Sequence, residues 1–205
     1  MKGRSLFLKN FIKAACVAFI LTIVYTMIPF QAACSDITDD VFRMHILANS
    51  DSEEDQNLKL KVRDRLLECS QTLFEQAKSK EEAEKVVADH LQELADAATA
   101  EIAENGYNYA VQAEITRMYF TTRHYENYTL PSGMYDALRI TIGEGKGHNW
   151  WCVMFPSLCI NTSADGDRKI KETLGDEEYD LVKNEQHEYK FFIVEFFEKI
   201  RSSFF

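Results

Sequence analysis

Basic residues are scarce in this 205-residue chain, which has 23 lysines and arginines against 33 acidic residues and a formal net charge of −10. Four of the basic residues come before the first acidic residue, Asp36, so removal of residues 1–34 takes the charge from −10 to −14. Nucleic acids and anionic membrane surfaces bind through basic patches. The composition therefore excludes both as general partners of the remaining 171 residues.

The common signatures of catalytic and metal sites are also missing. The five histidines show no zinc-ligand spacing such as His-x-x-x-His, and there is no Gly-x-Ser-x-Gly elbow for a nucleophilic serine. No cysteine stands in a recognisable nucleophile setting, and no internal repeat or low-complexity segment occurs. The sequence predicts no catalytic residue, no metal and no cofactor.

An apolar run fills residues 14–30 and is interrupted only by Thr22, Tyr25 and Thr26. Basic residues precede it and small residues follow it, which is the layout of a secretory signal. Its 17 residues are also just enough to span a bilayer, with the body on the outer side. We predict a signal peptide or N-terminal membrane anchor at residues 1–34 and one exported globular domain at residues 35–205; cleavage stays open.

Cysteine is infrequent, with five in the chain. Cys34 ends a stretch, beginning at Gln31, that resembles a lipoprotein cleavage site, but Gln31 stands where such sites usually carry leucine. We therefore favour peptidase cleavage, or none, over lipid attachment. Cys152 and Cys159 lie seven positions apart on the exported side, where a disulfide persists. A disulfide and two buried free thiols fit this spacing equally well.

Hydrophobic periodicity predicts a strand over residues 41–47, followed by two amphipathic helices. The first helix begins with Ser52 and Asp55, a capping-box pair. The second begins at Ser79 and stops at Asn105 and Gly106.

Alternation with period two then predicts strands over residues 109–116, 138–142 and 150–155, with a bulge or bend near Arg117. We interpret these strands as an antiparallel meander. Residues 161–187 are predicted to form a loop or weak helices, and residues 188–205 a short strand and a last helix. Because helices precede the strand cluster instead of alternating with it, the fold class is α+β, with two amphipathic helices on a mainly antiparallel sheet.

Three stretches have a chemical interpretation and a plainer one. Residues 143–149 are glycine-rich but lack a Walker ending, so a flexible hairpin turn is favoured over a phosphate loop. Residues 161–172 match a calcium loop poorly because three positive charges fall in it, so an acidic surface loop is favoured. His45 with Asp51 and Asp55 fits an acid–base group, although such polar residues more often cap a helix.

Several segments together resemble the stage II sporulation protein R family of endospore-forming bacteria. They are residues 42–56 (Phe-Arg-Met-His-Ile-Leu-Ala-Asn-Ser-Asp-Ser-Glu-Glu-Asp-Gln), 58–64, 130–135, 138–143, 147–159 (Gly-His-Asn-Trp-Trp-Cys-Val-Met-Phe-Pro-Ser-Leu-Cys) and 191–195. The resemblance runs from about residue 40 to the C-terminus, and so long an ordered set is more specific than any short motif.

The resemblance implies a signalling protein and not an enzyme. Members of the family are made in the forespore and exported into the space between the two membranes that separate forespore and mother cell. There they trigger a membrane-embedded sporulation protease of the aspartic type, which processes pro-sigma-E. Two alternatives stay open: an exported hydrolase that uses His45 and nearby carboxylates, and a binding module tethered by an uncleaved N-terminal helix.

A signal of this kind needs a surface that its receptor recognises. Polar, glycine-rich or exposed aromatic stretches without an obvious core role fall in the matching segments, at residues 49–56 and 143–151. The predicted partner-binding residues are Asn49, Asp51, Asp55, Gln56, His148 and Trp151. Of adjacent strand residues such as Trp150 and Trp151, one must face away from a one-sided core.

Overall fold

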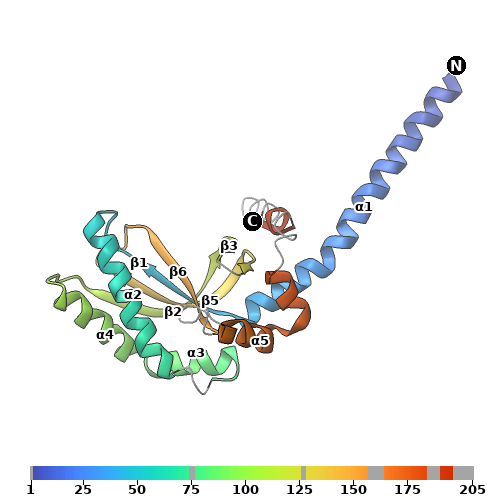
Figure 1. The fold of residues 1–205 in the computed structure, drawn as a ribbon. Coiled ribbons are helices and arrows are strands. Elements are labelled where there is room, and N and C mark those ends of the chain that lie inside the picture. The colour runs from blue at the N-terminus through green and yellow to red at the C-terminus, as the bar shows by residue number, and fades with distance from the viewer. Residues whose placement is uncertain (1, 74–76, 126–127, 157–163, 184–189, 196–205) are drawn as a thin grey trace.

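The structure is a computed structural model that describes residues 2–73, 77–125, 128–156, 164–183 and 190–195. Its elements, in chain order, are α1 (Lys2–Asp40), β1 (Phe42–Leu47), α2 (Glu53–Leu73), α3 (Lys80–Asp89), α4 (Leu91–Glu104), β2 (Val111–Phe120), β3 (Arg123–His124), β4 (Thr129–Leu130), β5 (Gly133–Ile142), β6 (Asn149–Phe155) and α5 (Ala164–Lys183). The α+β class is confirmed (Figure 1).

Strand β1 lies inside the sheet, whose order is β2-β5-β1-β6. It runs parallel to β5 and antiparallel to β6, and β2 runs antiparallel to β5. The predicted meander is therefore wrong, because β1 separates two strands that are consecutive in the chain. The physical reason is that five of the six β1 residues are buried, on both faces, and a strand of this kind needs neighbours and cover on every side.

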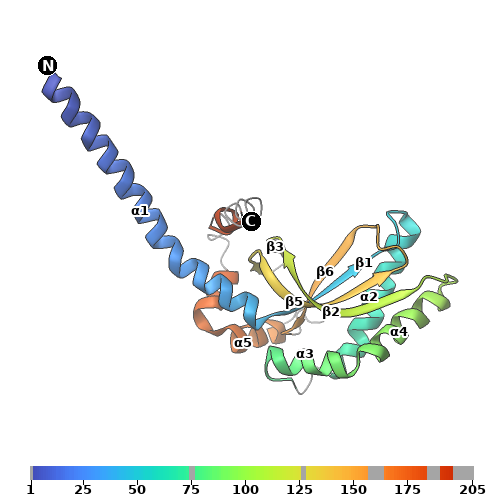
Figure 2. The same ribbon diagram turned by 180° about the vertical axis from the view of Figure 1, so that it is seen from behind.

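Two hydrophobic cores lie on opposite faces of the sheet. Helices α2, α3 and α4 cover one face, where Met44 and Ile46 of β1 point (Figures 1 and 2). The other core forms around Ile37, Phe120 and Tyr135 and includes residues of α1, α5 and the helical segment 190–195. This second core covers the sheet at one end only, because residues near the other end of that face, such as Gln112 and Asn149, are exposed.

The two cores explain why the alternation in β2 slips. We predicted a bulge or a strand bend near Arg117, and the bulge is absent: β2 pairs with β5 residue for residue from Val111 to Phe120. Ile115 contacts the core under the helices, whereas Phe120 belongs to the core on the other face. The strand is regular, and it is the covered face that changes along its length.

The helices start and stop at the predicted caps, except that one predicted helix is divided into two. Ser79 accepts a hydrogen bond from the Glu82 N–H at 3.3 Å and caps α3. Gly106, at φ +83°, follows the end of α4 as expected for a left-handed stop. The predicted single second helix is divided at His90, whose backbone ψ of 15° ends α3 before α4 begins.

The polar segment after the sheet contains more helix than a surface loop would. Residues 164–172, within the predicted acidic loop, belong to α5, which kinks at Gly175 with φ +82°. Residues 190–195 are also helical, and the Phe191 ring lies 5.2 Å from the ring of Phe30. The rest of the predicted last strand and helix lies outside the described residues.

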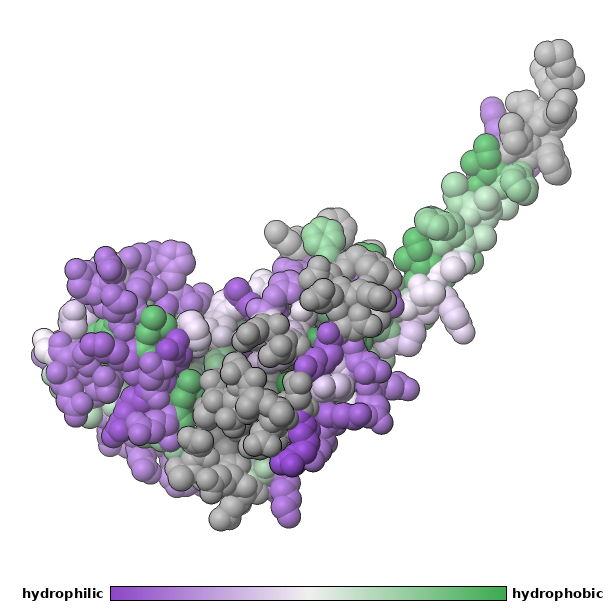
Figure 3. All heavy atoms as spheres, viewed as in Figure 1, coloured by the Kyte–Doolittle hydropathy of each residue, from purple (hydrophilic) through white to green (hydrophobic). Residues whose placement is uncertain are grey.

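Helix α1 joins the apolar run to the body without a break. It continues through Pro29, and Phe30, Cys34 and Ile37 are buried in the second core. Between Phe11 and Thr26, by contrast, the helix projects away from the body with a hydrophobic surface (Figure 3). Its length and composition are those of a helix that crosses a membrane or of a signal sequence.

Burial of Phe30 and Cys34 predicts how the body responds to truncation. A chain that starts at residue 29 keeps both side chains in the second core, whereas one that starts at residue 35 loses them. We expect the shorter chain to be less stable by about 3 kcal/mol, mostly from the lost burial of Phe30. Urea unfolding of the two proteins measures the difference. Equal unfolding midpoints would show that these residues add nothing to the body.

Candidate partner-binding surface

The connection between β5 and β6 crosses the end of β1, because β1 lies between these two strands. Two backbone–backbone hydrogen bonds attach the crossing to the residues after β1: Lys146 N–H donates to the Asn49 carbonyl at 3.2 Å and Gly147 N–H to the Ala48 carbonyl at 3.0 Å. We call residues 48–56 and 143–148 together the rim. The rim consists of two segments almost a hundred residues apart in sequence that form one layer.

Glycine is required where the two rim segments touch. A Cβ atom at Gly147 would collide with the Ser50 carbonyl group. One at Gly143, where φ is +58°, would collide with the side chain of Asn49 and would also need a left-handed backbone. The glycine-rich stretch is thus a tightly packed crossing, and not the predicted hairpin turn between paired strands.

Asp55 organises the first rim segment from inside. It is 5% exposed, and its Oδ2 accepts hydrogen bonds from Asn49 Nδ2 at 2.8 Å and Ser50 Oγ at 2.5 Å. Its own N–H donates to Ser52 Oγ at 3.2 Å, so Ser52 caps α2 as predicted. The capping box is only half formed, because the Asp55 carboxylate bonds the preceding turn and not the Ser52 N–H.

The surroundings of Asp55 favour its ionised form. Burial raises the pKa of this carboxyl group, but hydrogen bonds from Ser50, Asn49 and Tyr109 together outweigh that effect and hold the pKa below its usual range. The carboxylate is therefore charged at neutral pH and accepts several hydrogen bonds at once. That is the role of a structural capping group.

Asp51 and His148 form the exposed contact of the rim. Asp51 Oδ1 accepts from the His148 backbone N–H at 2.6 Å and lies 2.5 Å from its ring Nδ1. Their side chains are 55% and 79% exposed, respectively. The hydrogen bonds from His148 lower the pKa of Asp51. This pair presents one carboxylate and one imidazole to solvent in a fixed relative position.

Gln56 and Lys59 connect the rim to helix α2. Gln56 Nε2 donates to the Ser50 carbonyl at 2.9 Å, and its Oε1 accepts from Lys59 Nζ at 2.6 Å. The same ammonium group donates to the His148 carbonyl at 2.9 Å. Burial lowers the pKa of Lys59, which is only 4% exposed.

Lys59 was not among the residues predicted from the sequence, although its position in the helix pattern indicates a buried polar contact. Lys59 falls four residues after Asp55 on a stripe that continues with Val62 and Leu66, both buried. A charged residue within such a stripe needs a polar partner when the helix packs on a core. Here the partners are supplied by both rim segments.

The structure brings together five of the six predicted partner-binding residues: Asn49, Asp51, Asp55, Gln56 and His148. Trp151 is not among them. It pairs in register with His45 on the sheet face opposite α2, and its ring lies 3.5 Å from the Arg123 guanidinium carbon. Trp150 packs with the core under α2, and the Arg63 guanidinium lies 4.4 Å from its ring. The two tryptophans do lie on opposite faces, but the core is not one-sided as the prediction assumed, because Trp151 packs against the second core.

His45 does not join Asp51 and Asp55, so the predicted acid–base group is not formed. His45 is 4% exposed and packs against Phe120 and Trp151, with ring centroids 6.3 and 5.9 Å away. Burial lowers its pKa, and neither ring nitrogen makes a hydrogen bond of ordinary geometry. It is His148 that meets Asp51. Within the described residues, no group of three or more histidine, cysteine or acidic side chains is arranged to hold a metal ion.

The fold and this surface define a class of protein: an N-terminal apolar helix followed by an α+β body with a hydrogen-bonded polar rim. Residues 38–165 match the sequence profile of the stage II sporulation protein R family, which is more than half of the chain. The chain belongs to that family.

One relative is the protein named stage II sporulation protein R of Bacillus subtilis (strain 168). It is 38% identical over 136 residues, which cover 66% of this chain and 60% of the relative's length. No solved structure matches the chain.

Replacement of Asp55 by asparagine should destabilise the body in a pH-dependent way. The pKa of Asp55 is lower in the folded than in the unfolded chain, so its stabilisation is present above about pH 4 and disappears as the pH falls through the folded pKa. We expect Asp55→Asn to lose about 2 kcal/mol at pH 7, because two hydrogen bonds to a buried carboxylate are weakened. Urea unfolding at pH 7 and pH 3 measures this.

The exposed Asp51→Asn variant is the control, and its unfolding should change little. If Asp55→Asn loses as much stability at pH 3 as at pH 7, the ionised carboxylate is not what holds the turn.

Proposed function

We propose that this protein is an exported sporulation signal, which triggers a membrane-embedded aspartic protease of the mother cell to process pro-sigma-E. Membership of the stage II sporulation protein R family is the observation that carries the proposal. The matching part of the chain spans 60% of the length of its Bacillus subtilis relative.

The proposed location is the space between the forespore and mother-cell membranes. The projecting apolar part of α1 supports export, either as a signal sequence or as an anchor that keeps the body at the forespore membrane. Cys152 is disulfide-bonded, whereas Cys16, Cys34 and Cys69 form no disulfide. A disulfide persists in oxidising compartments, which agrees with an exported body. We propose Cys159, which lies outside the described residues, as its partner.

The proposed mode of action is binding and not catalysis. The buried carboxylate of the rim is occupied by structural hydrogen bonds, and the one buried histidine described above is separated from it. The rim instead presents Asp51 and His148 in a fixed arrangement, which lowers the entropic cost of recognition by a receptor. We therefore propose the rim as part of the receptor-facing surface.

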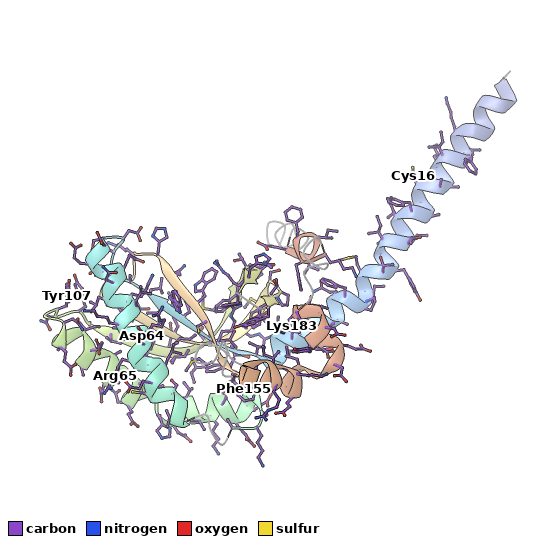
Figure 4. All side chains as sticks on the ribbon, in the orientation of Figure 1. Cys16, Asp64, Arg65, Tyr107, Phe155 and Lys183 are labelled. Atoms are coloured by element: carbon purple, nitrogen blue, oxygen red, sulfur yellow. The ribbon has the colours of Figure 1, made fainter. Side chains whose placement is uncertain are left out.

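Processing of pro-sigma-E in cells that hold the protease and its precursor tests the function. The full chain should cause processing, and its absence should abolish it. We expect Asp51→Lys with His148→Ala to reduce processing at least tenfold without a change in secretion or thermal stability, because both side chains are exposed. Asp64→Lys changes an equally acidic, exposed position on α2 and is the control (Figure 4).

Two results would count against these proposals. If the wild-type chain causes no processing, the signalling function is wrong. If the Asp51→Lys, His148→Ala chain is secreted, folded and fully active, the rim does not contact the receptor.

The disulfide predicts a thiol count for the exported protein. Alkylation of the denatured full-length chain without reductant should modify three of its five cysteines, and alkylation after reduction should modify all five. Peptide mass measurement should find Cys152 joined to Cys159. We expect Cys159→Ala to cost about 2 kcal/mol of stability, since the bond closes a short loop. Five free thiols in the exported protein would contradict the pairing.

A further inference from the structure

Part of the sheet face opposite the helices remains open to solvent. In register, Glu114, Arg139, His45 and Trp151 form one row across β2, β5, β1 and β6. The next row toward the rim contains Gln112, Thr141, Leu47 and Asn149. Directly opposed residues lie on the same face, so both rows share this face. We call these two rows the open face.

The open face is exposed at its edges and toward the rim, whereas its middle is not: His45 is 4% exposed, and Trp151 packs against the second core. The Arg139 and Glu114 side chains are 39% and 57% exposed, and Gln112 and Asn149 are exposed. Below the open face, toward the second core, Arg43 and Val153 are fully buried. The open face thus begins where the second core ends, and Asn149 makes it continuous with His148 of the rim.

Cations and aromatic rings gather on and beneath the open face. The Arg123 guanidinium stacks on Trp151, and Arg43 lies 4.1 Å from the Phe120 ring and 4.8 Å from the Tyr135 ring. Arginine and tryptophan are the residues most enriched where interfaces carry their binding energy. Two arginines, Arg123 and Arg139, reach the surface here, whereas Arg43 is fully buried and the exposed Glu114 shares the row of Arg139.

Hydrogen-bond donors in this region lack acceptors. Arg43 donates one hydrogen bond, to Tyr125 Oη at 2.6 Å, while its Nε and Nη1 have no partner. Nε of Arg123, Nε of Arg139 and Nε1 of Trp151 also have none. Arg139 Nη1 lies 3.5 Å from Glu114 Oε1, which is a long contact for an ion pair. Neither Arg43 nor Arg123 forms an ion pair with a described carboxylate. Glu195 interacts electrostatically with Arg123 and accepts a hydrogen bond from the Thr122 N–H at 3.4 Å.

We propose that the open face binds an extended acidic segment of the partner protein, with Arg123 and Arg139 receiving its carboxylates and Trp151 packing against its backbone. The unpartnered Nε atoms of Arg123 and Arg139 are buried, so a carboxylate reaches the Nη groups of these side chains, and arginine binds carboxylates through two parallel hydrogen bonds. An acidic segment is repelled by the rest of this chain and attracted here, which directs it to one face. This inference rests on the proposed signalling function, since it names the chemistry of the partner.

A synthetic hexaglutamate peptide tests the chemistry without the protease. The measurement uses the full chain in detergent micelles with the substitution Trp150→Phe, so that Trp151 is the sole tryptophan. Binding draws the Arg123 guanidinium away from the indole and should change its fluorescence in a saturable way. We expect the combined Arg123→Gln, Arg139→Gln variant to weaken binding at least tenfold, and 0.5 M salt to weaken it as well.

Two controls separate this result from general electrostatics. Arg65→Gln removes an arginine of similar exposure from α2, outside the open face, and should leave hexaglutamate binding unchanged (Figure 4). Hexaglutamine has the same length without the charge and should produce no saturable change. The proposal is overturned if hexaglutamate does not saturate, if hexaglutamine binds equally, or if the double variant binds as tightly as its parent.

The processing assay keeps the two proposals distinct. If the wild-type chain triggers processing of pro-sigma-E, the Arg65→Gln chain should also trigger it and the Arg123→Gln, Arg139→Gln chain should not. All three chains should have equal thermal stability. Full activity of the folded double variant would sink the open-face inference and leave the signalling function standing. A wild-type chain that triggers nothing would refute the function, whatever the peptide measurements show.

Discussion

The central position of β1 is the constraint on which the rest of the structure depends. Its residues are buried on both faces, so the strand is flanked by β5 and β6 and covered by helices on one side and by the second core on the other. Once β1 separates β5 from β6, their connection has to pass over the end of β1. The rim, its glycines and its hydrogen bonds to residues 48–50 all follow from that crossing.

The same arrangement decides which side chains are available to a partner. Helices α2, α3 and α4 protect the sheet face that carries Met44 and Ile46, and the second core protects only one end of the opposite face. The remainder stays open, next to the rim, with Arg139 and Trp151 in one row. The proposed signalling by contact would use such a preorganised region, whereas the carboxylate inside the turn contributes stability.

Prediction from sequence was accurate where local signals decide the structure. The caps at Ser52 and Ser79, the stop at Gly106 and the strand over residues 41–47 depend on neighbouring residues, and the structure confirms them. Strand order was wrong, because a hydrophobic pattern states that a strand is buried and not which strands lie beside it. The slip near Arg117 was misassigned for a related reason: a change of covering layer and a bulge leave the same periodicity.

The candidate site also has a part that local sequence signals predict and a part that depends on tertiary contacts. Sequence alone determined that residues 49–56 and 143–148 are polar, turn-forming stretches in segments that resemble one family, and that an apolar helix leads the chain. Only the tertiary structure decided that these stretches meet, that His148 and not His45 joins Asp51, and that Trp151 lies on another face with Arg123. The physical reason is that Asp51 and His148 are 97 positions apart and Arg123 and Trp151 are 28 apart, and strand pairing around β1 sets these contacts, which no local pattern encodes.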